Sequence, residues 1–470
     1  MISIIKNIVT ALFLVASLAS CVVGKKYKRA DLNTPGQFRT SVAVTADSVQ
    51  LPWRTFFREP QLITLIEDAL NKNKEVAVAI KNIEQLDLAV KQSRLGLLPT
   101  VNLSAGASRA WLSKNSLNGS LSEQFIGTSY MDDYTATLQV SWEADIWGKT
   151  KMQKEVAIAN YFGQQQNLAA LKTRIISQVA QAYYNLISLD EQLKIARKNI
   201  VLSDSTLDMM KLQYNAGQIN SLALDQAEAQ KKTAELLVPL AMQNIAVQEN
   251  ALSILCGSYP DGIAREGSFA EAQPNAAFAS AVPAQLLSRR PDVKSAEYAV
   301  VSANARTGLA KAAMYPAFSL SPQIGANSFR FNRWFDLPGS MTRTLAINLT
   351  QPIFQKRALR TAYETAALDQ EIAVIQFKQT VLTAVGEVSD AMARSEGASQ
   401  RKVLAQERTT SLNKATGDAL KLYTNGMATY LEVITAQNNR LQNDLELITI
   451  QLEHFNAVTD LYRALGGGVQ

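Results

Sequence analysis

The residues with the clearest chemistry lie near the N-terminus, where a cysteine follows a short apolar stretch. Lys6 is positively charged, residues 8–18 are mostly apolar, and Leu18-Ala19-Ser20 directly precedes Cys21. Small residues before a cleavage point are typical of a secretory signal peptide. A cysteine directly after that point resembles the bacterial lipobox, whose thiol is acylated before cleavage. We therefore predict a signal peptide at 1–20 and a covalent lipid on Cys21; the alternative is a plain secretory signal with an incidental cysteine.

The residues after Cys21 bear on where the lipid would hold the chain. Each buried acyl CH₂ contributes about 0.8 kcal/mol, so a multiply acylated cysteine is a stable anchor. Val22 follows the cysteine. In lipoproteins of this kind an aspartate at that position often signals retention at the inner membrane, so the valine favours the outer membrane. The basic stretch Lys25–Arg29 is interpreted as a solvated tether.

Other side chains offer little chemistry. The 470 residues include one histidine, His454, and two cysteines, Cys21 and Cys256. A histidine-dependent triad, a structural zinc site and a disulfide framework are therefore disfavoured. We predict no enzyme, no metal and no cofactor apart from the lipid. Adjacent carboxylates such as Glu67-Asp68 are interpreted as exposed charges rather than a glycosidase pair, and Cys256 as a buried, unreactive thiol.

The composition is that of a folded protein. Apolar residues make up 47% and charged residues 19% of the chain, which is ordinary for globular proteins. The net charge is +6, and no basic block exists outside Lys25–Arg29. Nucleic-acid binding therefore has no support. No internal stretch reaches the roughly 18 consecutive apolar residues of a membrane-spanning helix.

Four short segments have the alternation of β-strands within a sequence that otherwise reads as helix. Apolar and polar residues alternate over 101–107, 134–146, 318–327 and 344–350. Pro322 lacks a backbone N–H, so it predicts an edge strand or a bulge. Each segment is about as long as a membrane-spanning strand. Aromatic residues cluster near the segment ends, as in an interfacial girdle: Trp111, Tyr134, Trp147, Phe329, Trp334 and Phe354.

Strand number limits how these segments could enter a membrane. The smallest closed membrane barrels need about eight strands, and an open sheet in lipid would leave its edge groups without hydrogen bonds. Strands in a membrane therefore require several chains, each contributing four. The alternative from spacing alone is two soluble hairpins packed on a core.

The helical part has a heptad pattern. Apolar residues recur every seventh position from Val179 to Tyr214, and the pattern returns from Ile434 to Tyr462. Six heptads in one register are typical of a coiled coil. The helix expected over about 151–213 would be roughly 95 Å long at 1.5 Å per residue. That length suits a tube across the periplasm; a soluble rod is the alternative.

The two halves of the chain repeat each other in order. Leu98-Pro99 and Tyr315-Pro316 precede the strand pairs, which Asp145–Lys149 and Pro352–Lys356 follow. The long helices end at Tyr214-Asn215-Ala216-Gly217 and Tyr423-Thr424-Asn425-Gly426, before Leu224-Asp225 and Leu431-Glu432. Each glycine is a plausible left-handed helix C-cap. We expect these turns to be the tips of two long helical hairpins.

The repeat gives a division of the chain. The predicted parts are a signal peptide (1–20), a lipid-anchored tether (21–58), a first repeat (59–253), an equatorial linker (254–282), a second repeat (283–465) and a C-terminal tail (466–470).

Several motifs, taken together and in order, resemble the TolC-like outer-membrane factors and specifically their lipoprotein branch. They are Arg289-Arg290-Pro291-Asp292-Val293, Asp145-Ile146-Trp147-Gly148-Lys149, Tyr423-Thr424-Asn425-Gly426 and the ending Leu461–Gly468. The resemblance spans nearly the whole mature chain. It implies a mixed α and β membrane protein: a homotrimer with a 12-stranded outer-membrane barrel, four strands per chain, continued by a long α-helical coiled-coil tunnel in the periplasm. It also implies a periplasmic adaptor and an inner-membrane resistance-nodulation-division transporter as partners.

The same resemblance implies roles for residues near the hairpin tips. Family members close the periplasmic end with side-chain rings on the inner hairpin, usually acidic. Glu432 matches a gate carboxylate found in part of the family, whereas Thr435 stands where others carry a second aspartate. A ring of three Glu432 carboxylates would favour cations; a solvated helix charge is the alternative. Adaptor contacts are predicted at Tyr214, Gly217, Tyr423 and Gly426, which could equally serve only as helix caps.

The function expected from this resemblance is the passive outer-membrane channel of a tripartite efflux pump. The alternatives are the outer channel of a type I secretion system and a lipid-anchored coiled-coil scaffold without a pore. The transported substrate, the particular transporter and adaptor, and the resting state of the gate do not follow from the sequence. Arg290-Pro291-Asp292 is interpreted as a helix start, because proline suits a first turn and aspartate complements the helix dipole.

Overall fold

The computed structural model describes residues 23–29, 52–113, 115–128, 130–265, 269 and 289–467. The lipobox residues Leu18, Ala19 and Ser20 and the predicted lipidation site Cys21 lie outside these ranges, as does most of the predicted linker. The chain forms two compact units. Within the described residues, unit 1 holds 23–29, 84–162 and 298–375, and unit 2 holds the rest. Each unit therefore takes segments from both sequence repeats.

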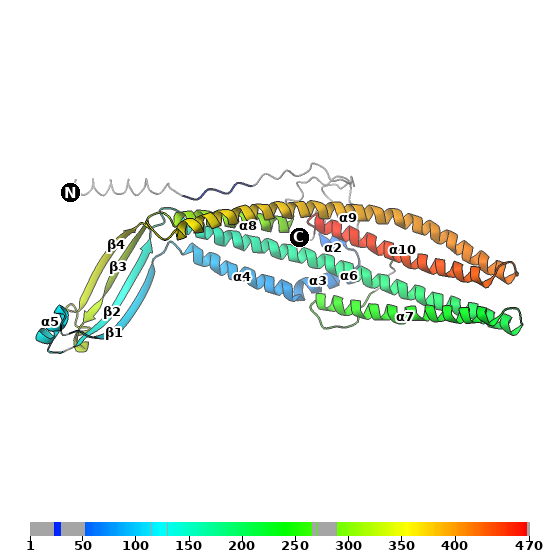
Figure 1. Cartoon of the computed structure of the whole chain (residues 1–470), viewed down its shortest axis with the longest axis horizontal. Helices are drawn as coiled ribbons and strands as arrows, with labels where there is room; N and C mark the ends of the chain where they lie inside the picture. The colour runs from blue at the N-terminus through cyan, green and yellow to red at the C-terminus, as the bar shows by residue number, and fades with distance from the viewer. Residues whose placement is uncertain are drawn as a thin grey trace. The chain divides into compact units, whose positions relative to one another are not determined.

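Unit 1 is built on one antiparallel sheet. Its strands are β1 (Thr100–Trp111), β2 (Tyr130–Glu143), β3 (Ala317–Ser328) and β4 (Met341–Thr350), in the order β1-β2-β3-β4 (Figure 1). All four predicted strands are confirmed. β2 ends three residues earlier than the expected Ile146, because the Asp145 carboxylate leaves the sheet to accept the backbone N–H groups of Thr150 and Lys151 at 2.9 and 3.0 Å.

The expectation for Pro322 is wrong. β3 lies between β2 and β4, so Pro322 is in an interior strand rather than at an edge. The pairing with β2 is interrupted between Gln139–Gln323 and Trp142–Leu320, and the register is the same on both sides, so there is no bulge. The missing proline N–H is tolerated as a local gap in one ladder, while Pro322 keeps its place opposite Leu345 in the other.

The loops at one end of the sheet carry short helices. α5 (Leu117–Ile126) connects β1 to β2, and η3 (Phe331–Arg333) connects β3 to β4. At the other end the strands connect to α4 (Lys74–Arg94), α6 (Lys149–Asn215), α8 (Pro291–Ala312) and α9 (Ala358–Thr424), in chain order. Each of these four helices contributes residues to both units.

Unit 2 is helical. It adds α2 (Trp53–Phe56), α3 (Pro60–Lys72), α7 (Ser221–Leu255) and α10 (Tyr430–Ala464). Its largest core is rich in aromatic rings, and Phe56 stacks on Tyr462 at 4.1 Å. Much of the predicted heptad seam of α6 is buried, including Val179, Leu186 and Leu207. Cys256 is buried as expected, and burial raises the pKa of its thiol to about 11. Among the described helices none combines the length and apolarity that crossing a membrane would require.

The helices confirm the repeat and correct its alignment. α6 and α9 each have 67 residues, and α7 and α10 each have 35. Counting from these helix starts, Glu432 is equivalent to Ala223 and not to Asp225, because the turns before α7 and α10 have the same length. The residues before α6 and α9, Gly148 and Arg357, are likewise equivalent, and both have positive φ (75° and 66°).

Candidate functional site

The sheet has two chemically different faces. Directly paired residues share a face, and the register places apolar pairs such as Leu103–Leu138 and Leu320–Ile347 on one of them. Many of these side chains are exposed in the chain; Leu103 is 78% exposed. The other face carries Asn102, Ser104, Thr137, Gln139, Gln323 and Thr344. One face therefore suits lipid and the other suits water.

The sheet also has two unpaired edges. β1 and β4 are its outer strands, and each pairs with one neighbour only within the described chain. Unpaired strand edges cannot remain open in lipid, so this sheet, if it lies in a membrane, needs hydrogen-bonding partners for β1 and β4.

Aromatic side chains lie at both ends of the strands. At the end joined to the helices, Trp147 packs on Tyr315 at 4.9 Å and donates its indole N–H to the Pro316 carbonyl at 2.7 Å. At the loop end, Trp111 is 73% exposed, and the ring of Tyr134 contacts that of Phe331 at 5.4 Å. This arrangement is typical of the interfacial girdles of membrane barrels.

The hairpin tips are closed by glycines as predicted. Gly217 and Gly426 have φ of 71° and 73°, and each donates its N–H to the carbonyl of the tyrosine three residues earlier. A side chain at either glycine would meet no atom within 4 Å, so the positive φ is the reason for glycine there.

The two tip tyrosines have different environments. Tyr214 is 43% exposed, whereas Tyr423 is 8% exposed. Tyr423 belongs to a cluster that joins the α9–α10 tip to the α6–α7 tip, with Leu207, Met210 and Val433 buried in it. Burial raises the pKa of Tyr423, and its hydroxyl bonds to the Gln213 amide oxygen. Adaptor contact stays a prediction, for which Tyr214, Gly217 and Gly426 offer exposed surface.

Glu432 and Thr435 are both exposed on the first turns of α10. The Glu432 carboxylate accepts the backbone N–H of Thr429 at 2.7 Å and also the Thr429 hydroxyl, as in a capping box. These hydrogen bonds lower the pKa of Glu432, and the bond from the Thr429 hydroxyl has the largest effect. The Thr435 hydroxyl donates to the Leu431 carbonyl at 2.7 Å. Glu432 therefore caps its own helix, and its predicted role as a gate carboxylate stays a prediction.

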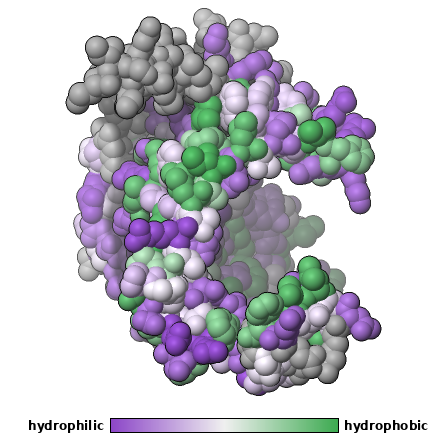
Figure 2. All heavy atoms as spheres, turned by 90° about the vertical axis from the view of Figure 1, so that its left-hand side faces the viewer, coloured by the Kyte–Doolittle hydropathy of each residue, from purple (hydrophilic) through white to green (hydrophobic). Residues whose placement is uncertain are grey.

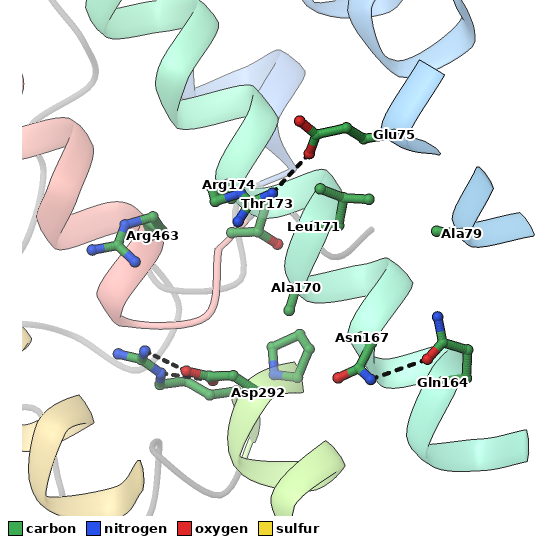
Figure 3. A pocket seen from close by; sticks show the side chains of 12 residues that line it. Glu75, Ala79, Gln164, Asn167, Ala170, Leu171, Thr173, Arg174, Asp292 and Arg463 are labelled. Atoms are coloured by element: carbon green, nitrogen blue, oxygen red, sulfur yellow. Dashed lines mark hydrogen bonds and ion pairs between the residues drawn. The ribbon is translucent and has the colours of Figure 1, made fainter. Parts of the chain in front are cut away.

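A charged pocket in unit 2 contains the Arg290-Pro291-Asp292 motif. It has a volume of about 420 Å³ and is lined by residues of α4, α6, α8 and α10 (Figure 3). Arg290 is 5% exposed; it contacts Asp292 and Glu387 at 2.7 Å and donates to the Ala464 carbonyl at 3.1 Å. Burial alone would raise the pKa of Asp292, but the hydrogen bonds and charge of Arg290 lower it.

The charges of this pocket are matched within the protein. Arg174 pairs with Glu75 at 2.9 Å, and Arg463 lies 3.5 Å from Glu387. α8 begins at Pro291 with Asp292 in its first turn, as the sequence predicted. The motif thus ties the start of α8 to α9 and to the end of α10. No group of three or more possible metal-ligating residues lies together in the described ranges.

The backbone of residues 23–29 contacts unit 1, which the predicted solvated tether did not anticipate. The backbone N–H of Val23 bonds to the Trp147 carbonyl at 3.4 Å, and Asn304 on α8 donates to the Lys25 carbonyl at 2.9 Å. A Cβ on Gly308 would meet the Met152 Sδ and would lie 3.1 Å from the Gly24 Cα, so a glycine at position 308 allows the two backbones to approach closely. The backbone is held on unit 1, while the lysine side chains stay exposed.

Sequence reasoning missed the partners that hold these sites. Gln213, Glu387, Asn304 and Gly308 lie within helices and belong to no motif. Gly308 alone gave a signal, because a glycine inside a helical pattern often marks a close approach.

Comparison with known proteins gives consistent matches over most of the chain. The model of the family described as "Outer membrane efflux protein" matches residues 65–258 and 282–467. The chain is 27% identical over 456 residues to the probable outer membrane lipoprotein SilC of Salmonella typhimurium, covering 96% of each. It is 28% identical over 421 residues to the toluene efflux pump outer membrane protein TtgF of Pseudomonas putida, covering 89% of this chain and 86% of TtgF. A crystal structure of CusC, from work on its folding and transmembrane channel formation, aligns with this chain with a TM-score of 0.86. The two are 26% identical, and the alignment covers 95% of this chain and all of the CusC chain.

Proposed function

This chain belongs to the outer membrane efflux protein family, and from that premise we propose that it is the outer-membrane channel of a tripartite efflux pump. It would passively conduct substrates from an inner-membrane resistance-nodulation-division transporter and a periplasmic adaptor across the outer membrane. The observation that carries the proposal is the four-stranded sheet, with one apolar face, one polar face and two open edges, connected directly to long helical hairpins.

The open edges favour a ring of copies. If β4 of one chain pairs with β1 of the next, three chains give the 12-stranded barrel expected for this family. Such a ring supplies partners to every edge group and exceeds the roughly eight strands that a closed membrane barrel needs. The apolar faces would then contact lipid and the polar faces would line the pore. Lipidation of Cys21 would add a second attachment to the membrane.

Of the two rival functions, the scaffold fits these observations less well. A scaffold without a pore leaves the exposed apolar face of the sheet unexplained. The relatives reported above are outer-membrane and efflux proteins by name, and TtgF is a toluene pump component. The substrate of this chain would be set by the inner-membrane transporter that delivers it. A type I secretion channel would share the architecture and differ in its partners.

The test is the assembly state followed by planar-bilayer conductance of the full-length, detergent-purified protein. We expect a trimer by native mass spectrometry and discrete, cation-selective conductance steps. Because a trimer with a closed gate could be silent, the same measurement is made on Tyr423→Phe, which lacks the hydrogen bond between the two hairpin tips. A monomer, or no conductance from either the wild-type or the Tyr423→Phe trimer, would contradict the proposal.

A further inference from the structure

A pocket at the loop end of the sheet combines aromatic rings with polar groups. It has a volume of about 450 Å³. Its rings are Tyr130, Tyr134, Phe329 and Phe331, and its polar side chains include Asp132, Arg330 and Asn332. The face in Figure 2, seen from the side that carries α5, shows hydrophobic patches between polar ones. The pocket belongs wholly to unit 1 and has no role in conduction as proposed.

The pocket opens on the apolar face of the sheet. Tyr130, Asp132 and Tyr134 alternate along β2 and share a face with Leu138, opposite Trp111, Arg109 and Ala107 of β1. If the chain forms the proposed barrel, this face contacts lipid, and the loop end lies away from the periplasmic helices. The pocket then lies at the outer-leaflet headgroup level, where aromatic girdles occur.

Within the described part of the chain, one positive charge of the pocket has no carboxylate paired with it. Asp132 is neutralised by Arg109, whose guanidinium bonds it at 2.6 and 2.8 Å and lies 4.0 Å from the centre of the Tyr130 ring. Arg330 lies over the Phe329 ring at 5.2 Å, and no carboxylate among the described residues pairs with it.

A second exposed cation lies on the same face. Arg343 is the third residue of β4 from the loop end, opposite Ile324. Its guanidinium contacts the Met341 sulfur at 3.0 Å. Arginine on the lipid-facing side of a barrel is destabilising at the membrane midplane and tolerated near the interface, where it can reach headgroup phosphates. Both cations thus favour an anionic headgroup.

We propose that this pocket binds the phosphorylated sugar headgroup of an outer-leaflet glycolipid. The inference rests on the proposed function, because it requires the sheet to lie in an outer membrane, whose outer leaflet is built of such lipids. The rings offer flat apolar surfaces for the C–H faces of a sugar. Asp132 and Asn332 offer an acceptor and an amide for its hydroxyls, and Arg330 offers a planar donor for its phosphate. A phospholipid would supply the phosphate and leave the rings without a sugar.

The experiment measures lipid binding to the trimer in phospholipid nanodiscs by native mass spectrometry. The probes are bis-phosphorylated lipid A, dephosphorylated lipid A and phosphatidylglycerol. We expect lipid A to bind more tightly than phosphatidylglycerol, and Arg330→Gln to weaken lipid A about tenfold, the effect of one hydrogen bond to a charged group. Dephosphorylated lipid A should bind the wild type and Arg330→Gln equally. Arg333→Gln, in the same loop and outside the pocket, is the matched control and should change nothing.

A second variant tests the sugar platform. Tyr134→Leu should weaken both forms of lipid A and leave phosphatidylglycerol unchanged. Equal binding of lipid A to the wild type, Arg330→Gln and Tyr134→Leu would overturn the inference, as would equal affinity of the wild type for lipid A and phosphatidylglycerol. Conductance in bilayers free of glycolipid is recorded in parallel. A protein that conducts but lacks selective lipid A binding refutes the pocket alone; a protein that neither forms trimers nor conducts refutes the channel.

Discussion

The hydroxyl of Tyr423, near the end of α9, donates a hydrogen bond to the amide oxygen of Gln213, near the end of α6. The bond joins the tips of the two helical hairpins of one chain. The ring of Tyr423 is buried in the cluster that the tips share, and it contacts Tyr430 at 6.5 Å between ring centres. The two hairpins are therefore held together where a periplasmic gate is predicted.

Tyr423→Phe should loosen this link while keeping the packing of the ring. One hydrogen bond contributes about 1 kcal/mol, so we expect the open probability, measured in planar bilayers, to rise roughly fivefold. Tyr214→Phe is the matched control, because Tyr214 holds the equivalent place in the other repeat and is exposed. Equal open probability of Tyr423→Phe and wild type would show that the link does not restrain the tips.

Glu432 can be tested so that charge and helix capping are separated. Glu432→Gln keeps the capping-box geometry, since glutamine also accepts from the N-cap residue, but it removes the charge. If Glu432 lines the constriction, Gln should reduce cation selectivity with little change in stability. Glu432→Ala should do the same and also destabilise the start of α10, because it removes the carboxylate that accepts the Thr429 N–H. Reversal potentials across a salt gradient give the selectivity. Unchanged reversal potentials in both variants would mean that Glu432 caps its helix and has no part in cation selectivity.

Arg290 should be the most sensitive position of the ion network. Its guanidinium is buried, while its partners Asp292 and Glu387 have side chains 39% and 30% exposed. Removing one member of a fully buried ion pair lowers the free energy of unfolding by about 3–5 kcal/mol. Because these carboxylates are partly exposed, we expect Arg290→Met to lower it by about 2–3 kcal/mol. The measurement is the thermal melting of the trimer. Arg289→Met is the control, because Arg289 is exposed; similar melting of both variants would contradict the assignment.

Gly308→Val should release residues 23–29 from unit 1. The added side chain would meet the Met152 side chain and the Gly24 backbone, and overpacking of this kind costs about 1–3 kcal/mol. We expect faster amide hydrogen exchange over 23–29 and unchanged exchange in the sheet. Gly386→Ala is the control, since a Cβ there meets nothing within 4 Å. Unchanged exchange at 23–29 would show that the close approach is not what holds the segment.

His454 should give the protein a pH dependence in the weakly acidic range. Burial lowers the pKa of its imidazole below the ordinary value of about 6.5, so the unfolded chain takes up the proton first as the pH falls. Stability should therefore decrease as the pH falls through 6.5 and level off below the pKa of the folded state. The melting temperature of wild type should fall more than that of His454→Gln between about pH 7.5 and 5.5. Parallel curves would contradict a buried neutral histidine.

The sequence determined the elements that depend on local pattern. Period-two alternation located all four strands, because a half-buried strand needs it, and the heptads located α6 and α10. Gly217 and Gly426 marked the hairpin turns, because the left-handed conformation selects glycine. Motif order also identified the family.

The tertiary structure decided what depends on distant neighbours. Pro322 lies in an interior strand because β2 and β3, far apart in sequence, pair on either side of a local gap. Tyr214 and Tyr423 occupy equivalent turns, but only Tyr423 meets the other hairpin, so only it is buried. Burial and pairing are set by which surfaces meet, and a repeated motif carries no information about which of its copies will face inward.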